Sequence, residues 1–225
     1  MILFAALLIS YLLGAIPSGF ILGKLIRKID IRDHGSKNIG ATNVLRILGV
    51  VPGIISLVFD FFKGFLALEI GRYLLLRSCK TTILGCNPCF NYSNPQIFQF
   101  SLVAIGIVAI IGHIYPIFLN FKGGKGMATG GGVFVNLLPI PSIIAFCVFI
   151  LVAAISKYIS LASLSAIITF FIVELIRNIP GFQEYPLLIL TTLIAALIIF
   201  RHKENISRLR RGEEHKITFR KKTKE

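Results

Sequence analysis

Charged residues are scarce in this 225-residue sequence and are missing from long stretches of it. Asp, Glu, Lys and Arg make up 15% of the residues, whereas soluble domains average about a quarter. Residues 97–121, 131–156 and 186–200 contain no charged residue. An apolar run of about 18 residues or more is long enough to cross a bilayer as a helix. The sequence therefore excludes a water-soluble enzyme and a disordered chain, and it predicts an all-α integral membrane protein.

Acidic residues are scarcer than basic ones, 10 against 24, which gives a net charge of +14. The basic excess lies in two polar stretches, residues 24–46 and 201–225. Basic stretches that flank membrane spans are typical of cytoplasmic loops, so we expect both on the cytoplasmic side and expect no nucleic-acid partner. The stretch 78–96 holds only Lys80 as a basic residue, so we expect it outside, together with the N-terminus.

Six apolar segments divide the chain, which we interpret as one membrane domain over residues 1–225 with a short basic tail at 201–225. Six crossings from an outer N-terminus would leave that tail outside, against its charge. Pro139 and Pro141 remove two backbone donors and break a helix, so 131–156 is predicted to hold a short helix before the break and a second piece after it. A bundle of about seven transmembrane helices, some short or broken, restores the parity. Five long spans with 157–200 partly re-entrant would also do so.

Three of the four cysteines, Cys79, Cys86 and Cys89, fall in the expected outer stretch. On an oxidising side they can form a disulfide, whose pairing the sequence does not determine. A zinc site would need a fourth ligand, and none is nearby, so no metal site is expected. Cys147 lies in a span and is expected to be a small core residue.

A first polar segment, residues 34–46, joins the first two spans. Glycines let the backbone approach a ligand closely, and successive N–H groups can form a nest for an anion. Arg46 can hold a phosphate through two parallel hydrogen bonds. The alternative is a capped helix start after a turn. The candidate site residues are Gly35, Ser36, Asn38, Gly40, Thr42, Asn43 and Arg46.

A second polar segment, residues 121–132, contains six glycines and two lysines. This composition favours a backbone cradle for phosphate, with a helix that begins near Met127 and points its positive end at the anion. The P-loop pattern GxxxxGK[ST] is not matched, and a flexible basic loop is the alternative. The candidate ligands are Lys122, Gly123, Gly124, Lys125, Gly126 and Thr129.

Two further features complete the candidate site. His202 and Asn205 follow the last span three residues apart, so both can face one way on a helix. His202 can shuttle a proton near neutral pH and Asn205 can donate to a phosphate, although a plain basic juxtamembrane helix is the alternative. Lys63 stands three residues after Asp60 inside the second span, where an ionisable residue either contacts a ligand or forms a structural pair.

Taken together, the three polar segments resemble the PlsY family, the bacterial glycerol-3-phosphate acyltransferases that use acyl phosphate as donor. The likeness covers nearly the whole chain, with Lys37 standing where a glycine or small residue is expected and with a longer outer stretch at 78–96. The matching motifs are Gly35-Ser36-x-Asn38-x-Gly40-Ala41-Thr42-Asn43-x-x-Arg46, Gly123-Gly124-Lys125-Gly126-x-Ala128-Thr129 and Arg201-His202-x-x-Asn205-Ile206-x-Arg208.

The resemblance implies transfer of an acyl group from acyl phosphate to the 1-hydroxyl of glycerol 3-phosphate, which gives lysophosphatidic acid and phosphate, the first committed step of phospholipid synthesis. It implies that Ser36, Arg46, His202 and Asn205 serve catalysis and that the glycine-rich segment binds glycerol 3-phosphate, without cofactor or metal. The expected partners are these two substrates and the lipid bilayer. The expected location is the bacterial inner membrane, with a monomeric protein.

The soluble-type glycerolipid acyltransferases, which carry an HxxxxD motif, are disfavoured because no histidine here is followed by Asp at that spacing. The CDP-alcohol transferases, which need several Asp to hold a metal, are disfavoured because the chain has only three Asp. The alternative from another class is a transporter of phosphate or organic anions. Such a transporter should carry its motifs on paired broken helices related by a repeat, and no internal repeat is apparent here.

Overall fold

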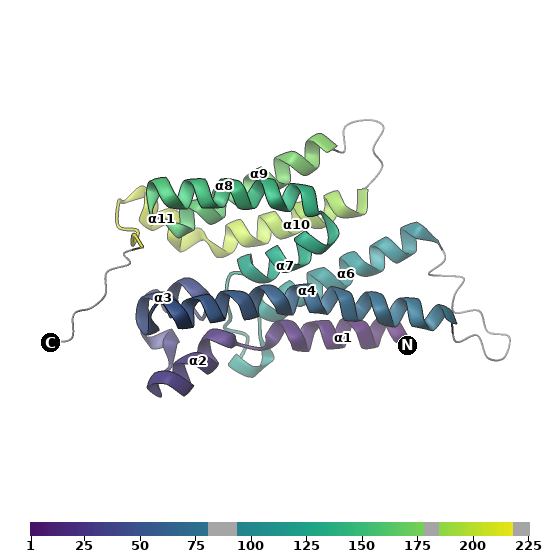
Figure 1. Cartoon of the computed structure of the whole chain (residues 1–225), viewed down its shortest axis with the longest axis horizontal. Coiled ribbons are helices and arrows are strands. Elements are labelled where there is room, and N and C mark those ends of the chain that lie inside the picture. The colour runs from purple at the N-terminus through teal and green to yellow at the C-terminus, as the bar shows by residue number, and fades with distance from the viewer. Residues whose placement is uncertain (81–93, 178–184, 218–225) are drawn as a thin grey trace.

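The protein is a bundle of helices (Figure 1). The structure is a computed structural model that describes residues 1–80, 94–177 and 185–217. Cys86, Cys89 and the side chain of Cys79 lie outside the described part, and with them the expected outer disulfide. Five helical segments are long and apolar enough to cross a membrane, namely Ile2–Arg27, Val50–Arg77, Pro95–Leu119, Pro139–Ser156 and Ile159–Arg177. Two shorter apolar helices, Met127–Leu137 and Leu187–Arg201, accompany them, which confirms the predicted fold class.

Two groups of helices lie on either side of a short central one (Figure 1). The first group consists of α1 (Ile2–Ala15), α4 (Val50–Lys80) and α6 (Pro95–Ile114). The second consists of α8 (Pro139–Ser156), α9 (Ile159–Arg177) and α10 (Tyr185–Arg201). The central helix is α7 (Met127–Leu137), which packs against α4. The end of the bundle away from the N-terminus carries α2 (Ser18–Arg27), α3 (Ala41–Leu48) and α11 (Lys203–Arg210), while η1 (Ile31–Asp33) and η2 (Ile117–Leu119) lie in connections.

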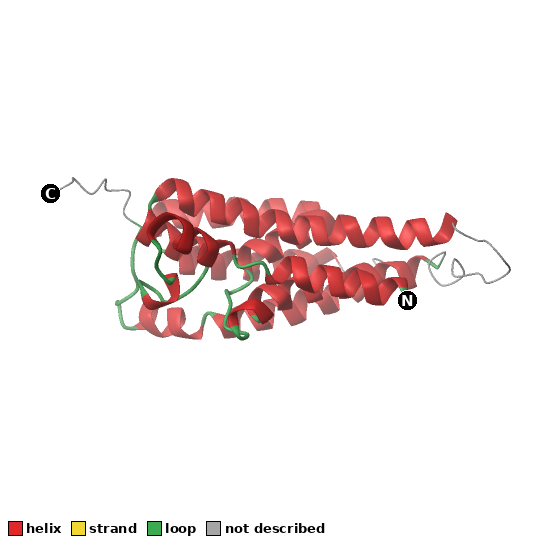
Figure 2. Ribbon diagram, turned by 90° about the horizontal axis from the view of Figure 1, so that it is seen from below, coloured by secondary structure: helices red, strands yellow, loops and turns green. Residues whose placement is uncertain are grey.

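The short helix α7 explains how the C-terminal part reaches the same end of the bundle as the basic stretch 24–46. It ends at Leu137, and Leu138 separates it from α8, directly before the two prolines. The expected break in 131–156 is therefore confirmed. Although α7 is short, it reverses the direction of the chain, so that α8 starts near the end of the bundle where the N-terminus lies (Figures 1 and 2). The C-terminal part consequently emerges at the same end as the basic stretch 24–46.

A buried ion pair stabilises a break in the first span. Proline lacks an N–H and disfavours helix in the residue before it, and accordingly α1 and α2 are separated by Ile16 and Pro17. At this break, the carbonyl oxygen of Ile16 accepts hydrogen bonds from Lys63 Nζ at 2.9 Å and from the backbone N–H of Ser18 at 3.2 Å. Lys63 also pairs with Asp60 at 2.9 Å, and Asp60 accepts from Ser18 Oγ at 2.8 Å. Because unpaired polar groups are costly inside a bilayer, these contacts favour the structural alternative for Lys63.

Helix α8 lies on the outside of the bundle, and most of its apolar side chains are exposed. Cys147 on this helix is exposed as well, so the expectation that it is a core residue is wrong. The helix is apolar on all sides, which is typical of a span in contact with lipid, and its sequence pattern therefore does not reveal which side faces the protein.

The contact between α4 and α7 depends on glycine. A Cβ atom at Gly132 would overlap the carbonyl oxygen of Phe61 on α4. A Cβ atom at the adjacent Gly131 would lie 3.7 Å from the Phe61 ring, an ordinary contact distance. Small residues let membrane helices approach backbone to backbone, so Gly132 sets the distance at which α7 sits.

We predict that Gly132→Ala and Gly131→Ala have opposite outcomes. Both raise the intrinsic helix propensity by up to about 1 kcal/mol, but only Gly132→Ala forces α7 away from α4. Overpacking of this kind costs roughly 1–3 kcal/mol. Thermal unfolding in detergent, followed by circular dichroism, should show a lowered Tm for Gly132→Ala and an unchanged or raised Tm for Gly131→Ala. Equal Tm values for the two variants would contradict this account of the contact.

Candidate active site

Asn43 holds the first polar segment in shape. It lies in the first turn of α3 and is 1% exposed. Its Nδ2 donates to the carbonyl oxygens of Ile31, His34 and Asn38 at 2.8–3.1 Å. Its Oδ1 accepts from the backbone N–H of Ser36 at 2.9 Å. Both ends of the amide are therefore engaged with the loop, and the contribution of Asn43 to the site is to shape the backbone that carries Ser36.

The turn before Asn38 requires left-handed backbone at two residues. Gly35 has φ of +61°, and a Cβ atom there would overlap Asn43 Oδ1. Lys37 has φ of +55°, a region that favours glycine. This explains physically why a small residue is expected at position 37. After the turn, Asn38 Oδ1 accepts from the N–H of Gly40 at 2.8 Å, directly before α3 begins. Thr42 is half-buried in the first turn of that helix.

The start of the glycine-rich segment is pinned to the end of α6. The N–H groups of Gly123 and Gly124 donate to the carbonyl oxygens of Ile114 and His113 at 3.1 and 3.0 Å. A Cβ atom at Gly124 would overlap the His113 ring. These two glycines are therefore needed for close packing, and their N–H groups are already bonded. In this structure, the backbone N–H groups of Gly123 and Gly124 are therefore not available to bind the phosphate that the sequence predicts at this segment.

Arg201 and the start of α7 fix the other side of the segment. Arg201 Nη2 donates to the carbonyl oxygens of Gly123 and Gly124 at 3.4 and 3.3 Å. Gly126 has φ of +85° and precedes α7, which begins at Met127 as predicted. The N–H groups in the first turn of a helix have no partners within that helix. Thr129 lies in this turn, fully buried.

Predicted residues from all three polar segments meet at one end of the bundle. Lys125 Nζ donates to Asn205 Oδ1, which joins the glycine-rich segment to α11. Arg46 Nη2 on α3 donates to the carbonyl oxygen of His215 at 3.1 Å. The neighbouring Glu214 accepts a hydrogen bond from Asn205 Nδ2 at 2.9 Å. Arg46 Nε is buried and has no hydrogen-bond partner among the described residues, which leaves this guanidinium with an unused donor.

Sequence reasoning missed Glu214 and its partner Ser160, and it named Arg208 only as part of the third motif. Glu214 Oε2 accepts from Arg208 Nε at 2.8 Å, and Oε1 accepts from Ser160 Oγ at 3.0 Å. Ser160 lies at the start of α9, far from the three segments in sequence, and no pattern marks it. The available signal for Glu214 was its charge, because it is one of few acidic residues in a strongly basic tail.

The site carries an excess of positive charge. Burial, together with the guanidinium groups of Arg208 and Arg46, lowers the pKa of Lys125 to about 8, although the carboxylates of Glu214 and Glu204 oppose this. Burial and the Arg208 guanidinium also lower the pKa of Arg46, while Glu214 raises it. Since bringing cations together in a buried place is unfavourable without an anion, the arrangement suits an anionic ligand.

His202 is neutral in this environment. Burial and the Lys125 ammonium lower the pKa of His202 to about 4. Its Nδ1 lies 2.8 Å from the carbonyl oxygen of Ile198, so Nδ1 carries the hydrogen of the neutral ring and Nε2 carries the lone pair. The lowered pKa of His202 favours a neutral ring that can accept a hydrogen bond at pH 7, and a role of this residue in proton transfer stays a prediction.

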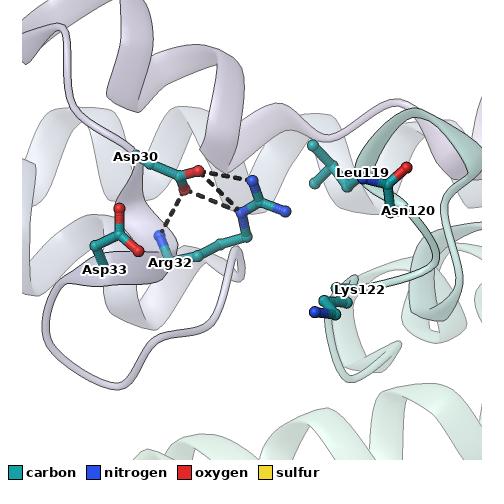
Figure 3. A pocket seen from close by; sticks show the side chains of 6 residues that line it. All are labelled: Asp30, Arg32, Asp33, Leu119, Asn120 and Lys122. Carbon is teal, nitrogen blue, oxygen red and sulfur yellow. Dashed lines mark hydrogen bonds and ion pairs between the residues drawn. The ribbon is translucent and has the colours of Figure 1, made fainter.

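Lys122 lies elsewhere. It is exposed and lines a pocket of about 370 Å³ between η1 and the end of η2 (Figure 3). Two carboxylates share this pocket, and one of them, that of Asp30, is paired with Arg32 at 2.6 Å. The structure therefore separates Lys122 from the contact between Lys125 and Asn205.

Comparisons with known proteins identify the family of this chain. A family model described as glycerol-3-phosphate acyltransferase matches residues 4–212. Glycerol-3-phosphate acyltransferases of Fusobacterium nucleatum and of Staphylococcus aureus strain JH9 are 40% and 41% identical, each over 97% of this chain and the whole of the relative. The chain belongs to the glycerol-3-phosphate acyltransferase family. The family expected from the three motifs is thereby confirmed, and the transporter alternative gains no support.

Solved structures extend the agreement within the acyltransferase family to the fold. A crystal structure of PlsY, an integral membrane glycerol 3-phosphate acyltransferase, in its glycerol 3-phosphate form has a TM-score of 0.77 and 34% identity to this chain. The lysophosphatidic acid form has a TM-score of 0.75. Each comparison covers 96% of both chains. The membrane bundle is therefore shared by this chain and the solved members of the family.

We predict that Lys125 sets the alkaline limit of activity. A lysine with a pKa of about 8 is charged below that pH and neutral above it, so kcat/KM for the anionic substrate should fall about tenfold per pH unit above 8. Lys125→Arg keeps its charge to much higher pH and should move this limit upward. Lys203→Arg, which changes an exposed lysine, is the control. An alkaline limit that stays in place in Lys125→Arg would assign it to another group.

Proposed function

We propose that this protein transfers an acyl group from acyl phosphate to the 1-hydroxyl of glycerol 3-phosphate, giving lysophosphatidic acid and inorganic phosphate. The convergence of Arg46, Lys125 and Asn205 from three separate segments carries this proposal. Both substrates bear phosphate, and a partly buried cluster of cationic and amide donors is suited to bind it. The related PlsY structures in glycerol 3-phosphate and lysophosphatidic acid forms support the same substrate and product.

The proposed reaction needs positioning and charge stabilisation rather than a strong nucleophile. Acyl phosphate is a mixed anhydride with a good leaving group. The substrate hydroxyl oxygen forms an ester bond with the acyl carbon, the bond from that carbon to the phosphate oxygen breaks, and the hydroxyl proton passes to a phosphate oxygen. Arg46 and Lys125 stabilise the negative charge, and Ser36 donates a hydrogen bond. His202, as a neutral ring, and Asn205 orient the reacting groups.

We also infer that the site faces the cytoplasm in a bacterial inner membrane and that the N-terminus lies outside. The end of the bundle that carries the site is also the end that carries α2, α3 and α11 (Figure 1). The basic stretches 24–46 and 201–217 lie there, and the positive-inside rule places such stretches in the cytoplasm. Water-soluble glycerol 3-phosphate would enter from that side, while the acyl chain remains among the apolar spans.

The deciding experiment uses the purified protein in detergent with acyl phosphate and glycerol 3-phosphate. We expect phosphate release that requires both substrates and produces lysophosphatidic acid in equal amount. Arg46→Lys should lower the rate by roughly 10–100-fold, because an ammonium group cannot reproduce the paired hydrogen bonds of guanidinium. Arg27→Lys, on the exposed surface of α2, should leave the rate unchanged. Uptake of phosphate into liposomes without acyl transfer would replace this proposal with a transporter.

Direct transfer makes a second prediction about Ser36. If the acyl group passes straight to glycerol 3-phosphate, no covalent intermediate forms on this hydroxyl. Protein quenched during turnover with radiolabelled acyl phosphate should carry no hydroxylamine-sensitive label on the peptide that contains Ser36. Omitting glycerol 3-phosphate should not cause such a label to accumulate. Stoichiometric label that disappears in Ser36→Ala would instead establish an acyl-enzyme.

A further inference from the structure

After α11 the chain turns back to the site as a short strap, which we define as residues 212–217. The turn is made at Gly212, with φ of +70°, and the N–H of Glu213 donates to the Arg208 carbonyl oxygen at 2.9 Å. At the far end, the N–H of Ile217 donates to the carbonyl oxygen of Lys157, between α8 and α9, at 2.9 Å. The strap is therefore fixed at both ends, and this holds the side chain of Glu214 against the site.

Glu214 is a buried charge with three donors. It is 7% exposed, and its carboxylate accepts from Ser160 on α9 and from Asn205 and Arg208 on α11. Burial raises the pKa of Glu214, but the hydrogen bonds from these three side chains outweigh it and lower the pKa below its ordinary value. The side chain is therefore an anion, and an anion buried in this way is costly unless its donors stay in place.

The carboxylate decides which way the amide of Asn205 points. A carboxylate only accepts hydrogen bonds, and an ammonium group only donates them. With Glu214 on one side and Lys125 on the other, Nδ2 must face Glu214 and Oδ1 must face Lys125, as observed. The reversed amide would set its N–H groups against the ammonium and its oxygen against the carboxylate. One Nδ2 hydrogen bonds to Glu214, and the second has no acceptor among the residues that the structure describes.

Glu214 also fixes the direction of Arg208. The hydrogen bond at Nε holds the guanidinium plane, at a place where its charge lowers the pKa values of Lys125 and Arg46. A single carboxylate therefore orders one amide and one cation beside the residues that we propose to hold phosphate.

We propose that Glu214 is a positioning residue for acyl transfer, acting through Asn205 and Arg208. It does not itself contact the phosphate-bearing substrates, which are anions like itself. The strap delivers this carboxylate from the C-terminal side of the chain, and it connects α11 with the start of α9. This inference rests on the proposed function, since it concerns the same site.

The test compares Glu214→Gln with Glu213→Gln in the full-length protein. The two residues are adjacent, and each substitution removes one negative charge, but Glu213 is 58% exposed and pairs with the exposed Arg211. We expect Glu214→Gln to lower kcat by roughly 10–100-fold, the range for a lost hydrogen bond to a charged group, with Tm close to that of the unchanged protein. Glu213→Gln should retain full activity.

A double-mutant cycle with Asn205→Ala separates positioning from a general structural role. If Glu214 acts through Asn205, adding Glu214→Gln to Asn205→Ala should cost far less than it does alone. If Asn205→Ala is inactive, the cycle uses dissociation constants of glycerol 3-phosphate in place of kcat values. These constants are measured by calorimetry in detergent for the unchanged protein, the two single variants and the double variant. If the Glu214→Gln variant does not fold, Glu214→Asp replaces it in this cycle. Aspartate keeps the negative charge, but its side chain is shorter and should not reach Asn205 and Arg208 equally well.

The outcomes distinguish this inference from the function on which it rests. Equal kcat values for Glu214→Gln and Glu213→Gln, or additive effects in the cycle, would overturn the role of Glu214 while the acyltransferase activity stands. No two-substrate phosphate release by the unchanged protein would overturn the proposed function itself. Loss of kcat confined to Glu214→Gln and non-additive with Asn205→Ala supports the inference.

Discussion

The contact between Lys125 and Asn205 is the interaction on which the site depends. It joins two segments that are 80 residues apart in sequence, one before the short helix α7 and one after the last span. The amide of Asn205 has a single orientation that satisfies both this ammonium and the carboxylate of Glu214. The strap, α11 and the start of α7 are therefore not independent elements. They supply Glu214, Asn205 and Lys125, and the hydrogen bonds between these side chains form only when all three elements are in place.

The bilayer explains why this chain of groups lies at the end of the bundle and why Lys63 and Asp60, inside the spans, are paired with each other. Inside the spans, the carbonyl oxygen of Ile16 at the break before Pro17 accepts a hydrogen bond from Lys63, which also pairs with Asp60. A charge held so closely has little capacity left for a ligand. At the end of the bundle that carries α3 and α11, in contrast, groups such as Arg46 Nε have no hydrogen-bond partner among the described residues. The same residue types thus serve structure in one place and are available for binding in the other.

The sequence predicts most of the fold, because the physical signals are local. Charge-free runs mark the spans, and two prolines separated by one residue, Pro139 and Pro141, mark the break between α7 and α8. It predicts the site less completely. Glu214 and Ser160 meet through contacts between distant segments, which no local pattern encodes. Cys147 could not be placed because α8 is apolar around its whole circumference and has no periodicity that would indicate a buried face.

The glycine-rich segment shows why composition identifies a region but not its ligands. Glycine density indicated a phosphate cradle, yet Gly124 is required because the His113 ring leaves no room for a side chain. The two lysines of the segment stand three residues apart, and the turn between them sends them to different surroundings. Lys122 remains exposed and lines a pocket together with Asp30 and Asp33, whereas Lys125 is partly buried near the guanidinium groups of Arg208 and Arg46. The second placement is the one at which we propose that phosphate binds, because an anion offsets the repulsion between neighbouring cations.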